Sequence, residues 1–323
     1  MEPVEEAALK GPTPRGWRAW TMKKKLIMFG GILAGIIALA IGLGVGLGVG
    51  LGGGGGGEDE EGGGETTTPP TSGNYTSAKW NPTAGTTWQI ELLYPLNDTS
   101  VDVDVYDIDL FDNNRSTITA LQDAGRKVIC YFSAGSYENW RPDKDDFKKA
   151  DLGSNLDGWP GEKWINISSP SIRSIMLGRL DLAKNKSCDG IDPDNVDGYD
   201  NSNGLGLTQA DSINYMNWMA NEAHARNMSI GLKNAGAIIP SVINNMQWSV
   251  NEQCAEYEEC DTYAAFTQKN KPVFHIEYPK GDDTNNNLSV SSSEKESACT
   301  FTGSGNFSTV IKNMDLDNWI ETC

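Results

Sequence analysis

The chain has 323 residues, with 26 Lys and Arg side chains against 44 Asp and Glu side chains, and its formal net charge is −18. We expect no nucleic-acid partner, because phosphates would meet a surface of the same sign. Only two histidines are present, His224 and His275. This count excludes a His-rich metal site, and a Ser-His-Asp triad would have to use one of the two.

The N-terminal quarter of the chain has the composition of a membrane anchor. Residues 1–25 carry six basic and three acidic side chains, and residues 26–51 carry no charge at all. A helix of this length spans a bilayer at 1.5 Å per residue. A cleaved signal peptide is the alternative, but its apolar core is usually shorter, about 7–15 residues. We therefore expect an uncleaved transmembrane signal anchor at 26–51, preceded by a cytoplasmic tail at 1–25.

Charges at the two ends of this span predict its orientation. Three lysines at 23–25 precede it, and an acidic run at 58–61 follows. The positive-inside rule then places the N-terminus in the cytosol and the C-terminal mass outside, as in a single-pass type II protein of the cell membrane. Residues 52–79 are rich in Gly, Thr, Pro and acidic side chains, which predicts a flexible linker and a site for proteolytic release.

All six cysteines lie beyond the linker, which fits disulfides in an oxidising compartment. Fifteen pairings are possible. The short separations favour Cys254–Cys260 and Cys299–Cys323, which would leave Cys130–Cys188. A cysteine metal site is the weaker alternative, because no Cys-x-x-Cys pair is present. Eight Asn-x-Ser/Thr sequons agree with secretion: Asn74, Asn97, Asn114, Asn166, Asn185, Asn227, Asn287 and Asn306.

Beyond the linker, short apolar or alternating runs predict eight strands. They are Thr87–Leu92, Asp104–Asp109, Lys127–Ser133, Cys188–Asp194, Met228–Asn234, Met246–Glu252, Pro272–Tyr278 and Phe307–Asn313. Helix-like stretches lie at Ser116–Ala124, Ser171–Lys184, Thr208–Arg226, Pro240–Asn245 and Ala255–Gln268. Eight strands that alternate with helices predict a TIM (β/α)8 barrel, an α/β fold, over residues 80–323.

An open doubly wound sheet is the structural alternative. Such a sheet normally carries a Gly-rich phosphate turn after its first strand, and no G-x-G-x-x-G follows Leu92. The connection Leu93–Val103 is too short for a full helix. We therefore expect a barrel that is irregular at its first connection.

Polar residues repeat at alternate positions of these strands, and such residues share one face. We expect this face to point to the barrel axis, where an active site would lie at the carboxyl ends of the strands. It comprises Gln89, Glu91, Asp107, Asp109, Tyr131, Ser133, Asp192, Asp194, Lys233, Glu252, His275 and Glu277. The opposite face is mostly apolar and comprises Trp88, Ile90, Tyr106, Ile108, Ile191, Phe274 and Ile276.

The densest acidic segment, Cys188–Asp200, contains five aspartates. A calcium loop of the EF-hand type is disfavoured, because Val196 stands where the third ligand should be. The segment also resembles the D-G-x-D-x-D-x-E signature of chitinases, but Val196 replaces the glutamate that would act as the acid. A second carboxylate must therefore come from another strand. Glu252 at the end of the sixth strand would face Asp194 at the end of the fourth, and glycoside hydrolysis needs such a pair.

Five segments in order resemble glycoside hydrolase family 114: Tyr106–Leu110, Val128–Gly135, Cys188–Tyr199, Gly231–Ala235 and Val250–Cys254. The similarity covers about residues 80–278. The resemblance implies a TIM barrel with endo-α-1,4-polygalactosaminidase activity. The membrane-anchored arrangement is similar to that of fungal members that act on galactosaminogalactan.

The catalytic pair that the resemblance implies falls on Asp194 and Glu252. We assign Asp194 as nucleophile and Glu252 as general acid/base in a retaining scheme; the reverse assignment and an inverting scheme stay open, because sequence does not give the carboxylate separation. Asp107, Asp109, Tyr131, Asp192, Lys233 and Glu277 would line the sugar sites. Trp140, Trp159 and Trp164 would either stack on sugar rings or pack in the core. We expect a monomer with no metal or other cofactor.

Two other functions stay open. One is a surface-anchored sugar-binding protein that has lost turnover, and the other is a glycosidase of the same fold that acts on a different aminosugar polymer. Beyond residue 57 the chain carries 41 acidic side chains against 20 basic ones. This surplus would attract a polysaccharide with free, cationic amines.

Overall fold

The computed structural model describes residues 78–282 and 284–323. The predicted tail, the predicted anchor at 26–51 and all but the last two residues of the linker lie outside this part. Within the described residues, no helix is both long enough and apolar enough to cross a membrane.

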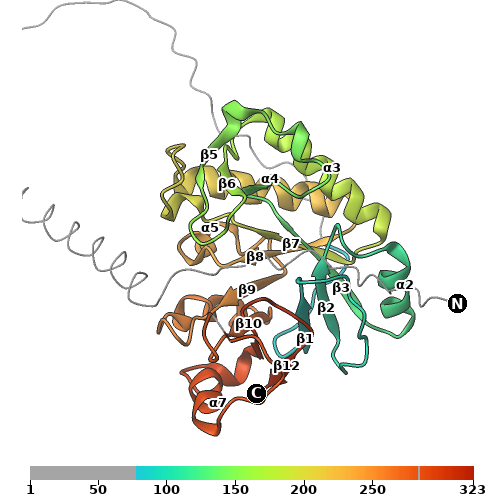
Figure 1. Cartoon of the computed structure of the whole chain (residues 1–323), viewed down its shortest axis with the longest axis vertical. Helices are drawn as coiled ribbons and strands as arrows, with labels where there is room; N and C mark the ends of the chain where they lie inside the picture. Colours follow the sequence, from blue (N-terminus) through green and yellow to red (C-terminus); the bar gives the residue numbers. More distant parts are fainter. Residues whose placement is uncertain (1–77, 283) are drawn as a thin grey trace, which may run out of the picture. The chain divides into compact units, whose positions relative to one another are not determined.

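Eight parallel strands form the central sheet, and each matches a predicted strand to within two residues at either end. In spatial order they are β1 (Trp88–Glu91), β2 (Val105–Asp109), β3 (Lys127–Ser133), β7 (Gly190–Asp194), β8 (Ser229–Lys233), β9 (Trp248–Glu252), β10 (Val273–Glu277) and β11 (Ser308–Lys312). A short ninth strand, β12 (Ile320–Thr322), pairs antiparallel with β11. The strands gather at the centre of Figure 1.

Side chains connect the first and eighth strands, so the sheet closes almost completely into a TIM barrel. The Trp88 indole donates a hydrogen bond to the Ser308 carbonyl at 2.7 Å, and the Lys312 ammonium donates to Gln89 Oε1 at 3.0 Å. The barrel is irregular where the sequence predicted it, since no helix lies between β1 and β2.

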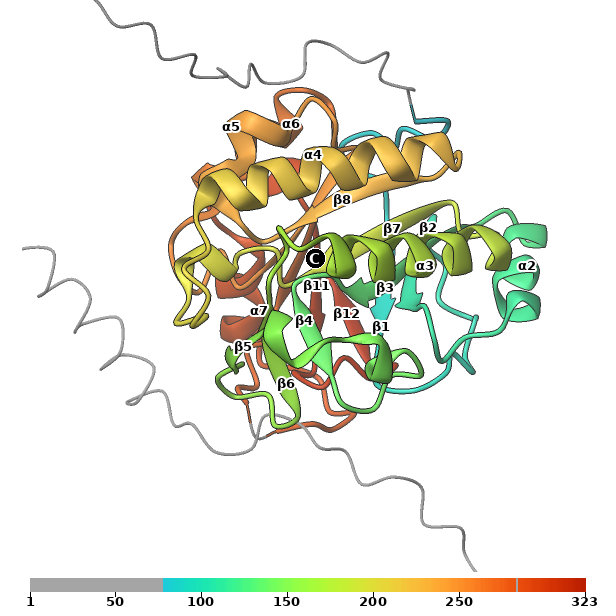
Figure 2. The same ribbon diagram turned by 90° about the horizontal axis from the view of Figure 1, so that it is seen from above.

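The helices cover the outside of the barrel. They are α2 (Arg115–Asp123), α3 (Pro170–Lys186), α4 (Gln209–Ala225), α5 (Ile239–Val242), α6 (Ala264–Thr267) and α7 (Ser292–Cys299). Helices α3 and α4 lie side by side over the sheet (Figure 2). Helix α4 begins with a capping box between Thr208 and Asp211, and it buries Met216, Met219 and Ala223 on one face.

The predicted helix Ala255–Gln268 is wrong over most of its length, because only α6 is α-helical there. A disulfide joins Cys254 to Cys260, and Gln253 and Glu258 have φ angles of 63° and 56°, which a right-handed helix excludes. The sequence analysis also did not predict α7, β12 or the small sheet described next.

A three-stranded antiparallel sheet follows β3 at the carboxyl end of the barrel. It consists of β4 (Ser136–Glu138), β5 (Leu152–Asn155) and β6 (Glu162–Ile165), in the order β4-β6-β5. Buried ion pairs tie it to the barrel: Arg141 contacts both Glu138 at 2.8 Å and Asp109 at 2.6 Å. The sheet is thereby held beside the open end of the barrel.

The barrel interior is apolar at its amino end. Trp88 stacks on Phe274 with ring centroids 4.9 Å apart, and Trp248 lies 6.2 Å from Phe274. Two glycines make room for Trp248: a Cβ on Gly231 would lie 2.0 Å from its indole nitrogen, and one on Gly190 would lie 2.5 Å from Cη2. Asp194, Lys233 and Glu252 are the last residues of their strands and therefore lie at the opposite, carboxyl end of the barrel.

The packing corrects the predicted face of two strands. Trp88, Ile90, Phe274 and Ile276, expected outside, pack with Trp248 in the barrel interior, whereas Tyr106, Ile108 and Ile191 pack outside as expected. On β10, His275 instead contacts Phe301 and Phe307 of the outer core, with ring centroids 5.3 and 5.9 Å away. The expectation failed because polar residues on these two strands find partners outside the barrel, which polarity alone does not reveal.

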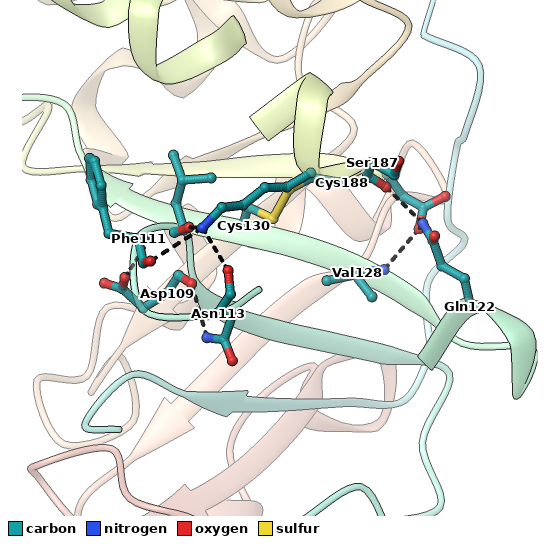
Figure 3. Close-up of a disulfide and its surroundings, with 11 residues drawn as sticks. Asp109, Phe111, Asn113, Gln122, Val128, Cys130, Ser187 and Cys188 are labelled. Carbon is teal, nitrogen blue, oxygen red and sulfur yellow. Dashed lines mark hydrogen bonds between the residues drawn. A yellow bond between two sulfur atoms is a disulfide. The ribbon is translucent and has the colours of Figure 1, made fainter. Parts of the chain in front are cut away.

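Three disulfides join all six cysteines in the pairing that the separations favoured: Cys130–Cys188, Cys254–Cys260 and Cys299–Cys323. Figure 3 shows the first, which links β3 to the residues before β7. Beside it, the Gln122 side chain donates to the Ser187 carbonyl and to Asp189 Oδ2, both at 2.8 Å. These contacts fix β7, which carries the acidic segment, against β3 and α2.

We expect Gly231→Ala to destabilise the barrel by about 1–3 kcal/mol, because the new methyl group would displace Trp248 from the interior. Urea unfolding followed by tryptophan fluorescence measures the change. Gly178→Ala in α3 is the matched control, since no atom lies within 4 Å of its new Cβ and alanine favours a helix by roughly 0.5–1 kcal/mol. Equal stability of Gly231→Ala and the wild type would contradict the packing account.

Candidate active site

A buried ammonium group stands between two carboxylates at the carboxyl end of the barrel. Lys233 Nζ, at the end of β8, lies 3.0 Å from Glu252 Oε2 and 3.5 Å from Asp194 Oδ1. The lysine side chain is 2% exposed, whereas those of Asp194 and Glu252 are 18% and 25% exposed. Adjacent strands β7, β8 and β9 place the three groups together, with both carboxylates open to solvent.

Asp194 is held by its neighbours on β3 and by its own backbone. The Tyr131 hydroxyl donates to Oδ2 at 2.8 Å, and the Asn195 backbone N–H donates to Oδ1 at 2.7 Å. Its carbonyl oxygen accepts from the backbone of Ala134 and Gly135. A Cβ on Gly135 would lie 1.6 Å from the Asn195 carbonyl oxygen, so only glycine permits this approach.

Glu252 accepts three hydrogen bonds from side chains. The Tyr278 hydroxyl lies 2.5 Å from Oε1, and Asn234 Nδ2 lies 3.2 Å from Oε2, which Lys233 also contacts. Burial raises the pKa of this carboxyl, but the Lys233 ammonium and the hydrogen bonds from Tyr278 and Asn234 outweigh it, and the net pKa is lowered. Glu252 is therefore ionised at neutral pH.

Lys233 stays charged despite its burial. Burial lowers its pKa, but the carboxylates of Asp194, Glu252 and Asp192 outweigh this effect and raise the pKa above the ordinary value. The centre of the site is thus one permanent cation among carboxylates.

Two further predicted residues, Asp107 of β2 and Asp192 of β7, lie together and are fully buried. Both belong to the group that surrounds Lys233, because their carboxyl groups interact with each other and with its ammonium. The structure thus brings together six of the eight predicted site residues: Asp107, Tyr131, Asp192, Asp194, Lys233 and Glu252.

The other two predicted residues have partners elsewhere. Asp109 is buried beside Arg141, whose Nη2 lies 2.6 Å from Oδ2, and it also accepts from the backbone of Phe111 and Asp112. Glu277 lies on the outer face of β10, where Oε1 accepts from the Ala255 backbone and contacts His275 Nε2, both at 2.8 Å. Asp109 therefore anchors the small sheet, and Glu277 anchors the loop after β9.

Sequence reasoning missed Tyr278 and Asn234, the two hydrogen-bond donors to Glu252. Each directly follows the last residue of its strand. Tyr278 shares a face with Phe274 and Ile276, so assigning these apolar residues to the interior would have found it.

Two of the three predicted sugar-stacking tryptophans are exposed near the small sheet. Trp140 and Trp159 are 50% and 41% exposed, whereas Trp164 is buried in β6. Because the small sheet follows β3 at the carboxyl end of the barrel, the two exposed indoles lie on the side of the molecule that carries the site. Trp164 belongs to the core.

One group of side chains among the described residues has the makeup of a metal site. Ligand atoms of Cys254, Cys260 and His275 lie within 4.8 Å of one another. The two sulfurs form a disulfide, however, and metals bind the thiolate form of cysteine. These residues do not fit a metal ion.

Comparisons with known proteins agree with this geometry. Over 78% of its length the chain matches the whole of the crystal structure of Aspergillus fumigatus Ega3 in complex with galactosamine, with 75% identity and a TM-score of 0.77. The glycoside hydrolase domain of PelA from Pseudomonas aeruginosa shares the fold at 10% identity, with a TM-score of 0.58 over 73% of this chain and 98% of that one. No curated protein matches. The model of glycoside hydrolase family GH114 matches residues 69–323, and the chain therefore belongs to that family.

Proposed function

We propose that this glycoside hydrolase cleaves α-1,4-galactosaminidic bonds inside galactosamine-containing polysaccharide such as galactosaminogalactan. One observation carries the proposal: Asp194 and Glu252 lie on either side of the Lys233 ammonium at the open end of the barrel. Membership of family GH114 and 75% identity to Ega3, which was crystallised with galactosamine, support the substrate class.

The spacing of the two carboxylates favours a retaining mechanism. The separation of Asp194 Oδ1 and Glu252 Oε2 cannot exceed the sum of their distances to Lys233 Nζ, 3.5 and 3.0 Å. This bound on the two facing oxygens is compatible with the about 5–5.5 Å separation of the carboxyl groups in retaining enzymes, compared with about 6.5–9.5 Å in inverting ones.

In the retaining scheme, Asp194 is the nucleophile and Glu252 is the general acid/base. Glu252 first takes up a proton from solvent. Asp194 then attacks the anomeric carbon while Glu252 transfers that proton to the departing glycosidic oxygen, which leaves a sugar ester on Asp194. Glu252 then takes a proton from water, which attacks the anomeric carbon and restores the Asp194 carboxylate. The Tyr131 hydrogen bond and the Lys233 ammonium orient Asp194 for the attack.

The surroundings of the site suit a cationic polymer. The loop after Glu252 exposes Glu256, Glu258 and Glu259 beside Tyr257, which is also exposed. Carboxylates attract the free amines of galactosamine, and an aromatic ring can stack on a sugar. Trp140 and Trp159 would extend this stacking along the polysaccharide from the other side.

We also propose that residues 26–51 anchor the enzyme in the cell membrane, with the barrel outside the cell and the linker as a site of release. The uncharged span, the lysines before it and the acidic run after it support this orientation. Deletion of residues 1–57 should move the protein from the membrane fraction to the soluble fraction; a deletion variant that stays membrane-bound would contradict the anchor.

We expect Asp194→Asn and Glu252→Gln each to lower kcat by about 100-fold or more, because each removes a group that reacts with the substrate. The assay measures short oligomers released by the full-length chain from deacetylated galactosaminogalactan, with the acetylated polymer as the poorer substrate. Asp102→Asn is the control, because its side chain is 91% exposed in a surface ion pair. Full activity of either active-site variant would refute the assignment.

The pH dependence tests the role of Lys233. An ammonium neighbour favours the ionised form of Glu252, so its removal in Lys233→Met favours the protonated form and raises the pKa of Glu252. Since Glu252 acts as an acid, the alkaline limb of kcat/KM should move to higher pH by about 1–3 pH units, although the remaining activity is low.

Lys184→Met, which removes the same charge from an exposed position of α3, is the control for this effect. Its alkaline limb should coincide with that of the wild type. A limb that stays in place, or moves to lower pH, in Lys233→Met would contradict the assignment of Glu252 as the acid.

A further inference from the structure

Beneath the catalytic pair, two buried carboxyl groups have no hydrogen-bond donor other than each other. Asp107 and Asp192 are both fully buried. None of their four carboxyl oxygens accepts a hydrogen bond from an N–H or hydroxyl group of the described residues. Two ionised carboxylates in this position would repel each other and would cost several kcal/mol to bury. One proton shared between them removes both problems.

The surroundings indicate which residue carries that proton. Burial is the largest effect on both groups: it raises the pKa of Asp107 well above its ordinary value, and that of Asp192 to about 7. Asp192 lies on β7, next to the strand that carries Lys233, whereas Asp107 lies on β2, so the ammonium favours the ionised form of Asp192 more strongly and leaves the shared proton on Asp107. The Lys233 ammonium favours the ionised form of each.

Charged groups from β7, β8 and β9 act on this pair. Asp194 on the same strand as Asp192 and Glu252 on β9 repel an anion at Asp192, whereas Lys233 on β8 attracts one. In turn, Asp192 is the third carboxylate that keeps Lys233 charged, after Asp194 and Glu252. The lysine therefore contacts two carboxylates at the mouth, and a third carboxylate inside the barrel further favours its charged form.

We propose that Asp107 is a positioning residue: it keeps a proton, donates it to Asp192, and so holds Asp192 as the anion that fixes Lys233 between Asp194 and Glu252. This inference rests on the proposed catalytic roles of Asp194 and Glu252. Because both aspartates are fully buried, it replaces the sugar contact that the sequence suggested for them.

The proposal is tested by the kcat/KM of full-length variants in which Asp107 or Asp192 is replaced by an uncharged residue. Asp107→Asn keeps a hydrogen-bond donor toward Asp192, so the loss of kcat/KM should stay within about tenfold, and Asp107→Leu, which removes the donor, should lose about 100-fold or more. Asp192→Asn removes the anion under Lys233 and should also lose about 100-fold or more.

The alkaline limb of the pH profile of kcat/KM distinguishes an electrostatic role of the two aspartates from a purely structural one. In Asp192→Asn it should move to lower pH, because the loss of a neighbouring anion favours the ionised form of Glu252. In Asp107→Asn it should stay within a few tenths of a pH unit of the wild type. The proposal would be overturned if Asp107→Asn and Asp192→Asn lost kcat/KM equally and neither variant shifted the alkaline limb of the pH profile.

Infrared spectroscopy of the unliganded protein tests the proton itself and needs no activity. The difference spectrum between wild type and Asp107→Asn at pH 7 should contain the carbonyl band of one protonated carboxyl group. Glu162→Gln is the reference, because burial raises the pKa of Glu162 to about 8 and it should give such a band as well. Absence of the band for Asp107 would overturn the proposal even if the enzyme proved inactive on galactosaminogalactan.

Discussion

The Lys233 ammonium, buried among carboxylates at the carboxyl end of the barrel, is the interaction on which the rest of the site depends. A charge removed from water is stable only when ions and hydrogen bonds of good geometry replace the solvent, and removal of one partner from a buried pair costs about 3–5 kcal/mol. Asp194, Glu252 and Asp192 supply that replacement. Because these partners come from β7 and β9 on either side of β8, any shift of one strand would break the group apart.

Several otherwise unrelated features of the molecule follow from this requirement. Tyr131 and Tyr278 donate to the two proposed catalytic carboxylates from the strands just outside β7 and β9. Gly135 allows the end of β3 to approach β7, and the Cys130–Cys188 disulfide joins β3 to the residues before β7. The apolar layer around Trp248 fills the barrel underneath the charges.

Alternation of polar and apolar residues predicted the eight strands and the central part of the site. It worked for β2, β3, β7, β8 and β9, where the polar residues do point into the barrel. It failed for β1, where Trp88 and Ile90 pack in the interior. It also failed for β10, because His275 and Glu277 find partners in the outer core and the loop after β9. Tyr278 was missed for the same reason. The role of Asp109 could not be predicted, since its partner Arg141 lies in the connection after β4, in a small sheet without a clear pattern in the sequence.

The positions of Asp194 and Glu252 beside Lys233 bear on the stereochemistry of the reaction. In the proposed retaining scheme Asp194, one of the two carboxylates beside the ammonium, attacks directly, and a double displacement retains the configuration of the α-linked substrate. Proton NMR of the first products, recorded before mutarotation, measures this directly. The account predicts that the new reducing ends appear as the α-anomer; initial appearance of the β-anomer would contradict it.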